Sequence, residues 1–287
     1  MAGTRELQLR MKSVQGTQQI TRAMKLVSTA KLQKVRAVAE ANQAYFESIR
    51  NTVRSIITSS GPDVLQPYLN SSPEGKDAYL LITSDRGLAG GYNSNVCKLA
   101  ERSIADKSRA VILPVGHKGR DYFARRGYTL GKEYESVDEI PQYSAVRSIG
   151  DELMEYYREG ELRSIYIVYT SFINTLTQQA QIVKLYPLSR EEFGQDAPGA
   201  KKPLMNFEPS AETVLGYVID QYVNAVLFGA LAESAASEQG ARMTAMDSAT
   251  DNAQSIVDSL RLRYNRARQG NITQELTEIV NGSNAVE

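Results

Sequence analysis

Residues 4–60 read TRELQLRMKSVQGTQQITRAMKLVSTAKLQKVRAVAEANQAYFESIRNTVRSIITSS, a stretch without proline and with a single glycine, Gly16. Alternating steps of four and three residues trace a seam along it that is apolar at both ends and polar in the middle. Such spacing is typical of a helix that packs along another helix. The seam positions are Leu7, Met11, Val14, Gln18, Thr21, Lys25, Ser28, Leu32, Val35, Ala39, Asn42, Phe46, Ile49, Val53 and Ile56. At 1.5 Å per residue, the stretch predicts one helix of roughly 80 Å.

A second, shorter apolar line runs through Ile20, Met24 and Val27, beside the polar middle of the seam. We expect the contact stripe to pass to this line where the seam becomes polar. The stripe would then wander around the helix, and the rod would be curved and asymmetric.

The last segment of the chain repeats the helical pattern. Pro209 and Ser210 open it, no proline follows, and Gly282 is a reasonable stop signal. Its seam is rich in small residues, which allow close approach of another helix. The seam positions run from Val218 through Tyr222, Ala225, Gly229, Ala232, Ala236, Gln239, Met243, Met246, Thr250, Ala253, Val257, Leu260 and Tyr264 to Ala267. This predicts a second rod, on the order of 100 Å long.

Between the rods, short apolar runs alternate with helical patterns. The expected strands are 78–83, 110–115, 164–171 and 177–186, and the expected helices are 94–105, 118–126 and 145–159. This alternation favours an α/β domain with a largely parallel sheet. The predicted fold class is therefore α/β, with a long antiparallel coiled coil of N- and C-terminal helices plus a central Rossmann-like α/β domain. The predicted domains are residues 1–60, 77–190 and 209–287, and the loop 189–209 is expected to be mobile or bound to a partner.

Connectivity requires the two rods to run antiparallel if they pair. Placing residue 57 opposite residue 210 sets residues 5–36 across from 231–262, and the longer C-terminal helix then overhangs as a single-helix tip. The distribution of charge supports this pairing, because the net charge of zero is the sum of a basic N-terminal segment and an acidic C-terminal segment. Residues 1–57 carry ten basic and three acidic groups, and residues 208–287 carry five basic and eleven acidic groups. Exposed ion pairs between the two helices would each contribute about 0–1 kcal/mol to stability. Their main effect would therefore be to fix the alignment of one helix along the other.

The segment Asp85–Asn93 (DRGLAGGYN) follows an expected strand and precedes an expected helix, where α/β folds cradle phosphate. Its glycine spacing matches neither common phosphate-binding pattern, so a tight turn is the better interpretation. His117 is the only histidine and Cys97 the only cysteine, which argues against a zinc cluster, a hydrolytic triad and any internal disulfide. We expect a solvated His117, a buried Cys97, a reducing compartment and no cofactor.

Targeting signals are not apparent in the sequence. The N-terminus lacks the apolar region of a signal peptide, and no run reaches the roughly 18 apolar residues that span a bilayer. Membrane association is therefore expected only through a partner.

Four segments resemble, in order along the chain, the gamma subunit family of F-type ATP synthases. Residues 9–32 resemble the family's N-terminal helix, 82–93 its central loop, and 237–253 and 264–282 its C-terminal signature. Departures are small: Ala89 stands where the family usually has Cys, Ser283 where it usually has Ala, and Gly16 where Asn or Lys is common. The paired-cysteine insertion of the chloroplast subunit is absent, which indicates a bacterial type.

The resemblance implies a central rotor shaft that couples ion-driven rotation of the c-ring to conformational cycling of catalytic beta subunits, for ATP synthesis or reverse ATP-driven pumping. The implied partners are the alpha and beta subunits around the shaft, the epsilon subunit and the c-ring, with no nucleic acid and no direct membrane contact. The implied location is the cytoplasmic face of the bacterial plasma membrane, as a peripheral, non-catalytic subunit. The residues that match family positions for contact with alpha and beta subunits are Met24, Lys25, Glu238, Arg242, Arg268, Gln269, Thr273 and Glu275.

Two other functions remain open from the residues alone. A nucleotide-binding α/β enzyme with a dimerising coiled coil would bind ATP at Gly87–Gly91. A coiled-coil nucleic-acid binder would use the basic residues between 10 and 36, with strongly salt-dependent affinity. No aromatic residue is interleaved with those basic groups before Tyr45, which disfavours the second alternative.

Overall fold

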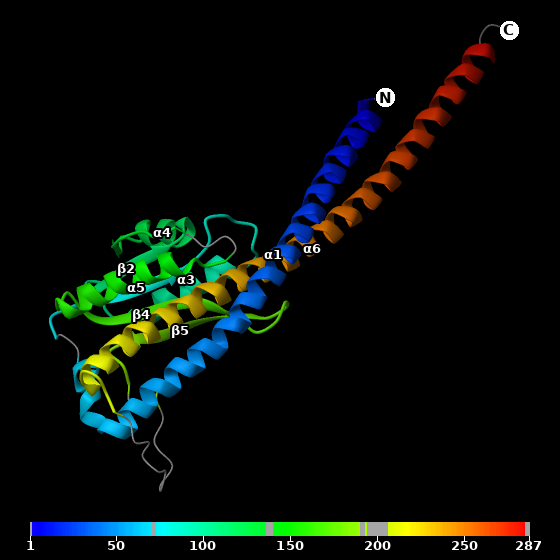
Figure 1. The fold of residues 1–287 in the computed structure, drawn as a ribbon. Helices are drawn as coiled ribbons and strands as arrows, with labels where there is room; N and C mark the ends of the chain where they lie inside the picture. Colours follow the sequence, from blue (N-terminus) through cyan, green and yellow to red (C-terminus); the bar gives the residue numbers. More distant parts are fainter. Residues whose placement is uncertain (1, 71–72, 136–139, 190–192, 194–205, 285–287) are drawn as a thin grey trace. The chain divides into compact units, whose positions relative to one another are not determined.

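The computed structural model describes residues 2–70, 73–135, 140–189, 193 and 206–284. They belong to two compact units, one comprising Thr29–Ala241 and the other pairing Met1–Ser28 with Arg242–Glu287. Two long helices, α1 (Ala2–Ser60) and α6 (Ala211–Asn284), contribute to both units (Figure 1). Each unit is described by itself below.

The larger unit contains a five-stranded sheet in the order β3-β2-β1-β4-β5. Its strands are β1 (Lys76–Ile82), β2 (Ala110–Val115), β3 (Thr129–Leu130), β4 (Leu162–Phe172) and β5 (Gln178–Tyr186). The pairs β1–β2, β1–β4 and β2–β3 are parallel, and β4–β5 is an antiparallel hairpin. The prediction of an α/β fold with a largely parallel sheet is thus confirmed.

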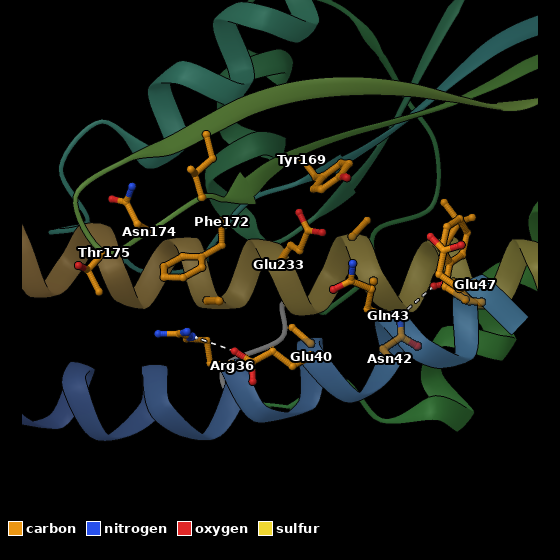
Figure 2. Close-up of a pocket in the computed structure, with 18 residues that line it drawn as sticks. Arg36, Glu40, Asn42, Gln43, Glu47, Tyr169, Phe172, Asn174, Thr175 and Glu233 are labelled. Atoms are coloured by element: carbon orange, nitrogen blue, oxygen red, sulfur yellow. Dashed lines mark hydrogen bonds and ion pairs between the residues drawn. The ribbon is translucent and has the colours of Figure 1, made fainter. Parts of the chain in front are cut away.

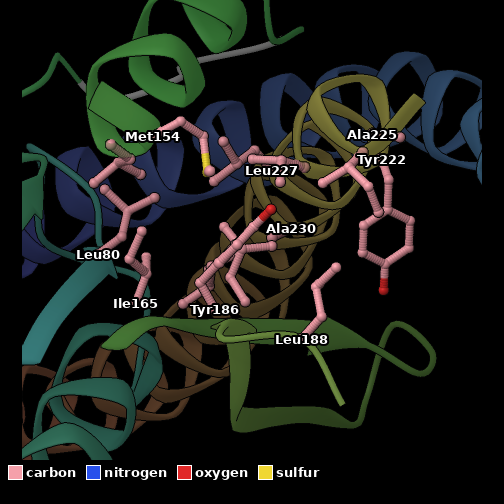
Figure 3. Close-up of a cluster of buried hydrophobic side chains, with 14 of the residues drawn as sticks. Leu80, Met154, Ile165, Tyr186, Leu188, Tyr222, Ala225, Leu227 and Ala230 are labelled. Carbon is pink, nitrogen blue, oxygen red and sulfur yellow. The ribbon is translucent and has the colours of Figure 1, made fainter. Parts of the chain in front are cut away.

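Helices cover both faces of this sheet. Along β1, Tyr79 and Leu81 point to the face covered by α3 (Tyr92–Ser103) and α4 (His117–Ala124). Ala78, Leu80 and Ile82 point to the opposite face, where α5 (Tyr143–Arg158) packs together with parts of α1 and α6. Figure 3 shows Leu80 and Ile165 of the sheet beside Met154 of α5 and Leu227 of α6. The C-terminal part of α1 and the N-terminal part of α6 therefore belong to the hydrophobic core of the larger unit.

Within the larger unit the two long helices run antiparallel. Asn42 donates from Nδ2 to the carbonyl oxygen of Ala225 (3.4 Å), and Tyr45 donates to Oε1 of Gln221 (3.5 Å). These pairs fit the register predicted from residues 57 and 210. The predicted seam is buried here, since Leu32, Val35, Ile49, Val53 and Ile56 of α1 are all at most 8% exposed.

In the smaller unit the helices are also antiparallel, and side-chain bridges join them. Gln18 donates to Gln254 (2.8 Å), the hydroxyls of Thr21 and Thr250 share a hydrogen bond (2.7 Å), and Lys25 pairs with Asp247 (2.5 Å). The predicted register would have placed Lys25 opposite residue 242. It is therefore wrong by about one helical turn in this unit.

The expectation that α1 contacts α6 through the second apolar line, where the seam becomes polar, is also wrong. Ile20 and Val27 are 62% and 56% exposed, whereas Thr21 and Ser28 of the polar seam are buried. The seam continues through its polar positions because hydroxyl, amide and charged groups find partners on α6. The wandering stripe, and the curvature inferred from it, are not supported.

The α6 helix contains a window with mean hydropathy 1.4 that is long and apolar enough to cross a membrane. The expectation that no segment is long and apolar enough to span a bilayer is therefore wrong for α6. Half of the window is buried inside the chain, and core packing of α6 accounts for its apolar composition.

Three short elements were not predicted: the 3-10 helix η1 (Pro62–Leu65), helix α2 (Gln66–Leu69) and the two-residue strand β3. Each is too short to show a period in the sequence. The loop expected at 189–209 lies mostly outside the described residues.

Candidate functional site

The interior of the helix pair in the smaller unit combines polar bridges with buried apolar side chains of α6 such as Val257 and Leu260, and much of its outside is apolar. Its bridges involve Thr21, Lys25 and their partners, while large apolar side chains on both helices face outward. These exposed side chains are Leu9, Ile20, Leu26 and Val27 on α1 and Ile256, Leu262, Ile272 and Leu276 on α6. Exposed apolar side chains that gather on one helix pair are typical of a surface that another protein covers.

The α6 helix is longer than its partner. In the register set by Lys25 and Asp247, α1 begins close to residue 270 of α6, and α6 continues to Asn284 (Figure 1). Side chains from Ile272 to Glu278 are exposed. The overhanging single-helix tip is thus present.

The eight proposed contact residues fall into two groups by exposure. Arg268, Gln269, Thr273 and Glu275 are exposed on the last turns of α6, and Met24 and Lys25 are half-buried on α1. Glu238 and Arg242 are 5% and 9% exposed. Because a buried side chain presents little surface to a second chain, Glu238 and Arg242 fit contacts within the shaft better than contacts with a partner. All eight assignments remain proposals.

In the segment Asp85–Asn93, the side chains of Asp85 and Asn93 bind neighbouring backbone groups. Asn93 Oδ1 accepts from the backbone N–H of Ser84 (3.0 Å), Ser84 Oγ donates to the carbonyl of Arg86 (2.6 Å), and Asp85 Oδ1 accepts from the N–H of His117 (2.8 Å). A phosphate cradle needs backbone N–H groups directed at open space. The acceptors on Asp85 and Asn93 instead take two such groups, which fits a structural turn.

Thr83 and Gly116 lock this turn to the end of β2. Thr83 Oγ1 donates to the carbonyl of Val115 (2.9 Å) and accepts from the N–H of Gly119 (2.9 Å). Gly116 has φ 88°, and a Cβ there would lie 2.4 Å from the carbonyl oxygen of Thr83. Only glycine fits this contact, so tight backbone packing explains the residue.

The single cysteine is buried and the single histidine is exposed. Burial raises the pKa of the Cys97 thiol to about 12, and its side chain is 1% exposed. A buried thiol with a raised pKa is a poor nucleophile. The His117 side chain is 61% exposed. Among the residues that the structure describes, no group of three or more His, Cys, Asp or Glu side chains is placed to hold a metal ion.

A cavity of about 570 Å³ lies in the larger unit, between α1, α6 and the hairpin of β4 and β5 (Figure 2). Its walls include Phe46 of α1, Glu233 of α6 and Phe172 of β4. The sequence analysis missed it. The signal was Glu233 itself, an acidic residue in a helix segment otherwise composed of small and apolar residues.

Comparison with known proteins gives one consistent family. A family model described as ATP synthase matches residues 3–286. The chain is 45% identical to the ATP synthase gamma chain of Lachnoclostridium phytofermentans, over 100% of both chains. It is 43% identical to the sodium-ion-specific ATP synthase gamma chain of Acetobacterium woodii, over 98% of each.

Solved structures of similar fold come from mitochondrial ATP synthases. A chain of the Euglena gracilis enzyme aligns with TM-score 0.71 and 20% identity over 99% of this chain and 95% of that one. A chain of the Tetrahymena thermophila central stalk and c-ring assembly aligns with TM-score 0.58 and 22% identity over 80% of this chain and 99% of that one. At these identities the likeness shows the fold. With the family match and the full-length relatives, it follows that the chain belongs to the family of ATP synthase gamma chains.

Proposed function

We propose that this chain is the rotating central stalk of a bacterial F-type ATP synthase, coupling c-ring rotation to ATP synthesis and to reverse pumping. The carrying observation is the helix pair of the smaller unit, where large apolar side chains such as Leu9, Ile20 and Leu262 are exposed. Burial of such side chains stabilises association by about 25 cal/mol per Å². A surrounding hexamer of alpha and beta subunits would supply that burial.

Within this proposal, residues 1–60 and 209–287 form the shaft and residues 77–190 form a foot that carries the epsilon subunit and rests on the c-ring. The shaft acts by touching the beta subunits unequally. A rotor in equal contact with every beta conformation would shift no population, however tightly it bound. The side chains proposed for these contacts are Met24 and Lys25 on α1 and Arg268, Gln269, Thr273 and Glu275 on α6, with Glu238 and Arg242 acting inside the shaft.

Catalysis belongs to the ATP synthase complex, and we propose that this chain contributes none of the reacting groups. The internally bonded turn at Asp85–Asn93, the buried Cys97 and the exposed His117 all support this. We also propose that the complex lies on the cytoplasmic face of the plasma membrane, with this chain held there as a peripheral subunit through the c-ring.

Lys25 gives a test of the coupling role. We expect Lys25→Glu to assemble with the other subunits and to hydrolyse ATP but to pump ions poorly, because the proposed contact with an acidic beta segment becomes repulsive. Hydrolysis and ion pumping are measured together in membrane vesicles. Lys34→Glu, the same charge reversal at an exposed position of α1, should pump normally.

A double variant separates contact with a partner from contact within the shaft. Lys25→Glu combined with Asp247→Lys restores an ion pair between α1 and α6. If the pumping defect persists in the double variant, the partner role of Lys25 holds. Recovery of full pumping would assign the whole effect to the shaft and overturn that role.

Two binding measurements address the alternative functions. The purified chain should bind neither labelled ATP at micromolar concentration nor DNA or RNA with the steep salt dependence of phosphate contacts. Stoichiometric ATP binding that is lost on altering Gly87–Gly91 would contradict the non-catalytic assignment. Restoration of rotary ATPase activity to alpha and beta subunits on adding the chain is the expected positive result.

A further inference from the structure

The cavity of the larger unit is closed on three sides and polar at its centre. Figure 2 shows α1 below, α6 behind, and Tyr169 and Phe172 of β4 above, with Glu233 directed from α6 toward Tyr169. Its volume of about 570 Å³ lies within the 300–1,000 Å³ range of small-molecule sites.

Among the residues that the structure describes, Glu233 is the carboxylate of this cavity that forms no ion pair. Glu40 pairs with Arg36 (3.2 Å) and Glu47 pairs with Arg50 (2.9 Å). Among the described residues, Oε2 of Glu233 is buried and has no hydrogen-bond partner. An unpartnered buried oxygen is unfavourable, so a ligand that donates a hydrogen bond to it relieves that cost.

Tyr169 is the aromatic residue beside Glu233 in the cavity. The pKa of Tyr169 is raised to about 12, first by burial and then by the charge of Glu233. The Tyr169 hydroxyl already accepts a hydrogen bond from Gln181. The unpartnered oxygen of Glu233 therefore has an aromatic ring at its side.

The shape and lining favour one class of cation. Phe46 and Phe172 present ring surface that suits methylene groups and attracts ammonium groups. Hard metal ions prefer six or more oxygen ligands, and Glu233 does not stand in a cluster of acidic side chains here. Arg36 also lines the cavity but pairs with Glu40, and Glu47 pairs with Arg50, so Glu233 is the carboxylate left for an ammonium group.

We propose that this cavity binds a linear organic polyamine, with one ammonium group on Glu233 and the methylene chain along Phe46 and Phe172. The site is distinct from the exposed helix surfaces assigned to the rotor function. It gives the larger unit a ligand that stabilises the packing of α1 and α6 against the β4–β5 hairpin, since a ligand that binds only the folded state raises its stability.

The test is calorimetric titration of the full-length chain with spermidine at 150 mM salt. We expect saturable binding of one spermidine per chain, and Glu233→Gln should weaken it at least tenfold. Glu155→Gln removes the same charge from an exposed position of α5 and should change the affinity less than twofold. Glutamine matches glutamate in shape, and a thermal melt of each variant verifies that it is folded.

A second variant tests the cavity rather than the charge. Ala39→Leu places bulk in the cavity wall while leaving Glu233 in place, and it should also abolish saturable binding. Three results would overturn the proposal: no saturable binding by the wild-type chain, equal affinity in Glu233→Gln, or equal weakening in Glu155→Gln. Displacement of spermidine by an equal concentration of Mg²⁺ would likewise overturn the assignment to an organic cation.

Discussion

Thr83 connects two strands and a helix through one hydroxyl group. It is 2% exposed, donates to the carbonyl of Val115 and accepts from the N–H of Gly119. The N–H of Gly119 belongs to the first turn of α4, where a helix leaves its N–H groups without internal partners. Thr83, which directly follows β1, therefore caps the N-terminus of α4 from a position distant in sequence.

Thr83→Val should destabilise the chain by about 1–3 kcal/mol, because the buried N–H of Gly119 loses its partner, whereas the carbonyl of Val115 keeps the backbone N–H of Thr83. Denaturant unfolding measures this as a lower midpoint. Thr52→Val removes an exposed hydroxyl that bonds only to the carbonyl of Ser48 on the same helix, and it should shift stability by less than about 0.5 kcal/mol. Equal midpoints for the two variants would contradict the role given to Thr83.

Cys97 should be nearly inert while the chain is folded. With its pKa raised to about 12 from a usual 9.0, little thiolate forms at pH 8. Stability should also decline as the pH rises above 9, since the unfolded chain releases the thiol proton there and the folded chain retains it up to about 12. Labelling with a disulfide reagent at pH 8 should be at least a hundredfold slower in buffer than in denaturant. Fast labelling of the native chain would show that the thiol is accessible.

At the scale of elements, two glycines differ in whether their position requires glycine. Gly16 lies inside α1, and a Cβ there meets nothing within 4 Å. Gly116 has a positive φ and no room for a side chain. The sequence shows both only as glycine, and the backbone geometry distinguishes them.

Gly16→Ala should stabilise the helical pair by about 0.5–1 kcal/mol, since alanine loses less backbone entropy in a helix than glycine does. Gly116→Ala should destabilise by about 1–3 kcal/mol through strain and overlap with Thr83. Hydrogen exchange near residue 16 and global unfolding, respectively, report the two effects. A destabilising Gly16→Ala would indicate an unrecognised contact at that turn.

Periodicity predicted the long elements well and the contacts between helices less well. The strands β1, β2, β4 and β5 and the helices α1 and α6 were predicted because each is long enough to show its period. The register in the smaller unit was not, because one residue pair at the end of a long helix cannot fix alignment some thirty residues away. The polar seam at Gln18, Thr21 and Lys25 was read as a gap in the contact, although its side chains bond directly to α6.

The candidate site was predictable only in part. The overhang of α6 followed from length alone, and the resemblance named Arg268 and Gln269, which the structure exposes. Burial of Glu238 and Arg242 depends on packing that no local pattern reveals. The cavity at Glu233 required three segments distant in sequence to be placed together.

At the scale of the whole molecule, burial differs strongly between the two units. Ala78–Ile82 of β1 are all buried, whereas no side chain between residues 4 and 20 is. Local opening requires less free energy where less apolar surface is buried. The free chain should therefore exchange amide hydrogens of residues 4–20 at least a hundredfold faster than those of β1.

Mass spectrometry of deuterium uptake measures this difference. In an assembled complex with alpha and beta subunits, the proposed function predicts strong added protection of residues 4–20 and little change in β1. Equal uptake in the free chain would contradict the burial argument. Unchanged uptake on assembly would count against the shaft proposal alone.

The overhang of α6 has a mechanical consequence. A twisting load applied near Lys25 and Asp247 is shared by two backbones joined by side-chain bridges. The same load applied beyond Ile272 is carried by one helical backbone. Torsional stiffness rises with the number of helices that share a load. The single-helix tip is therefore the most easily twisted part of this unit, and elastic deformation under torque accumulates there first.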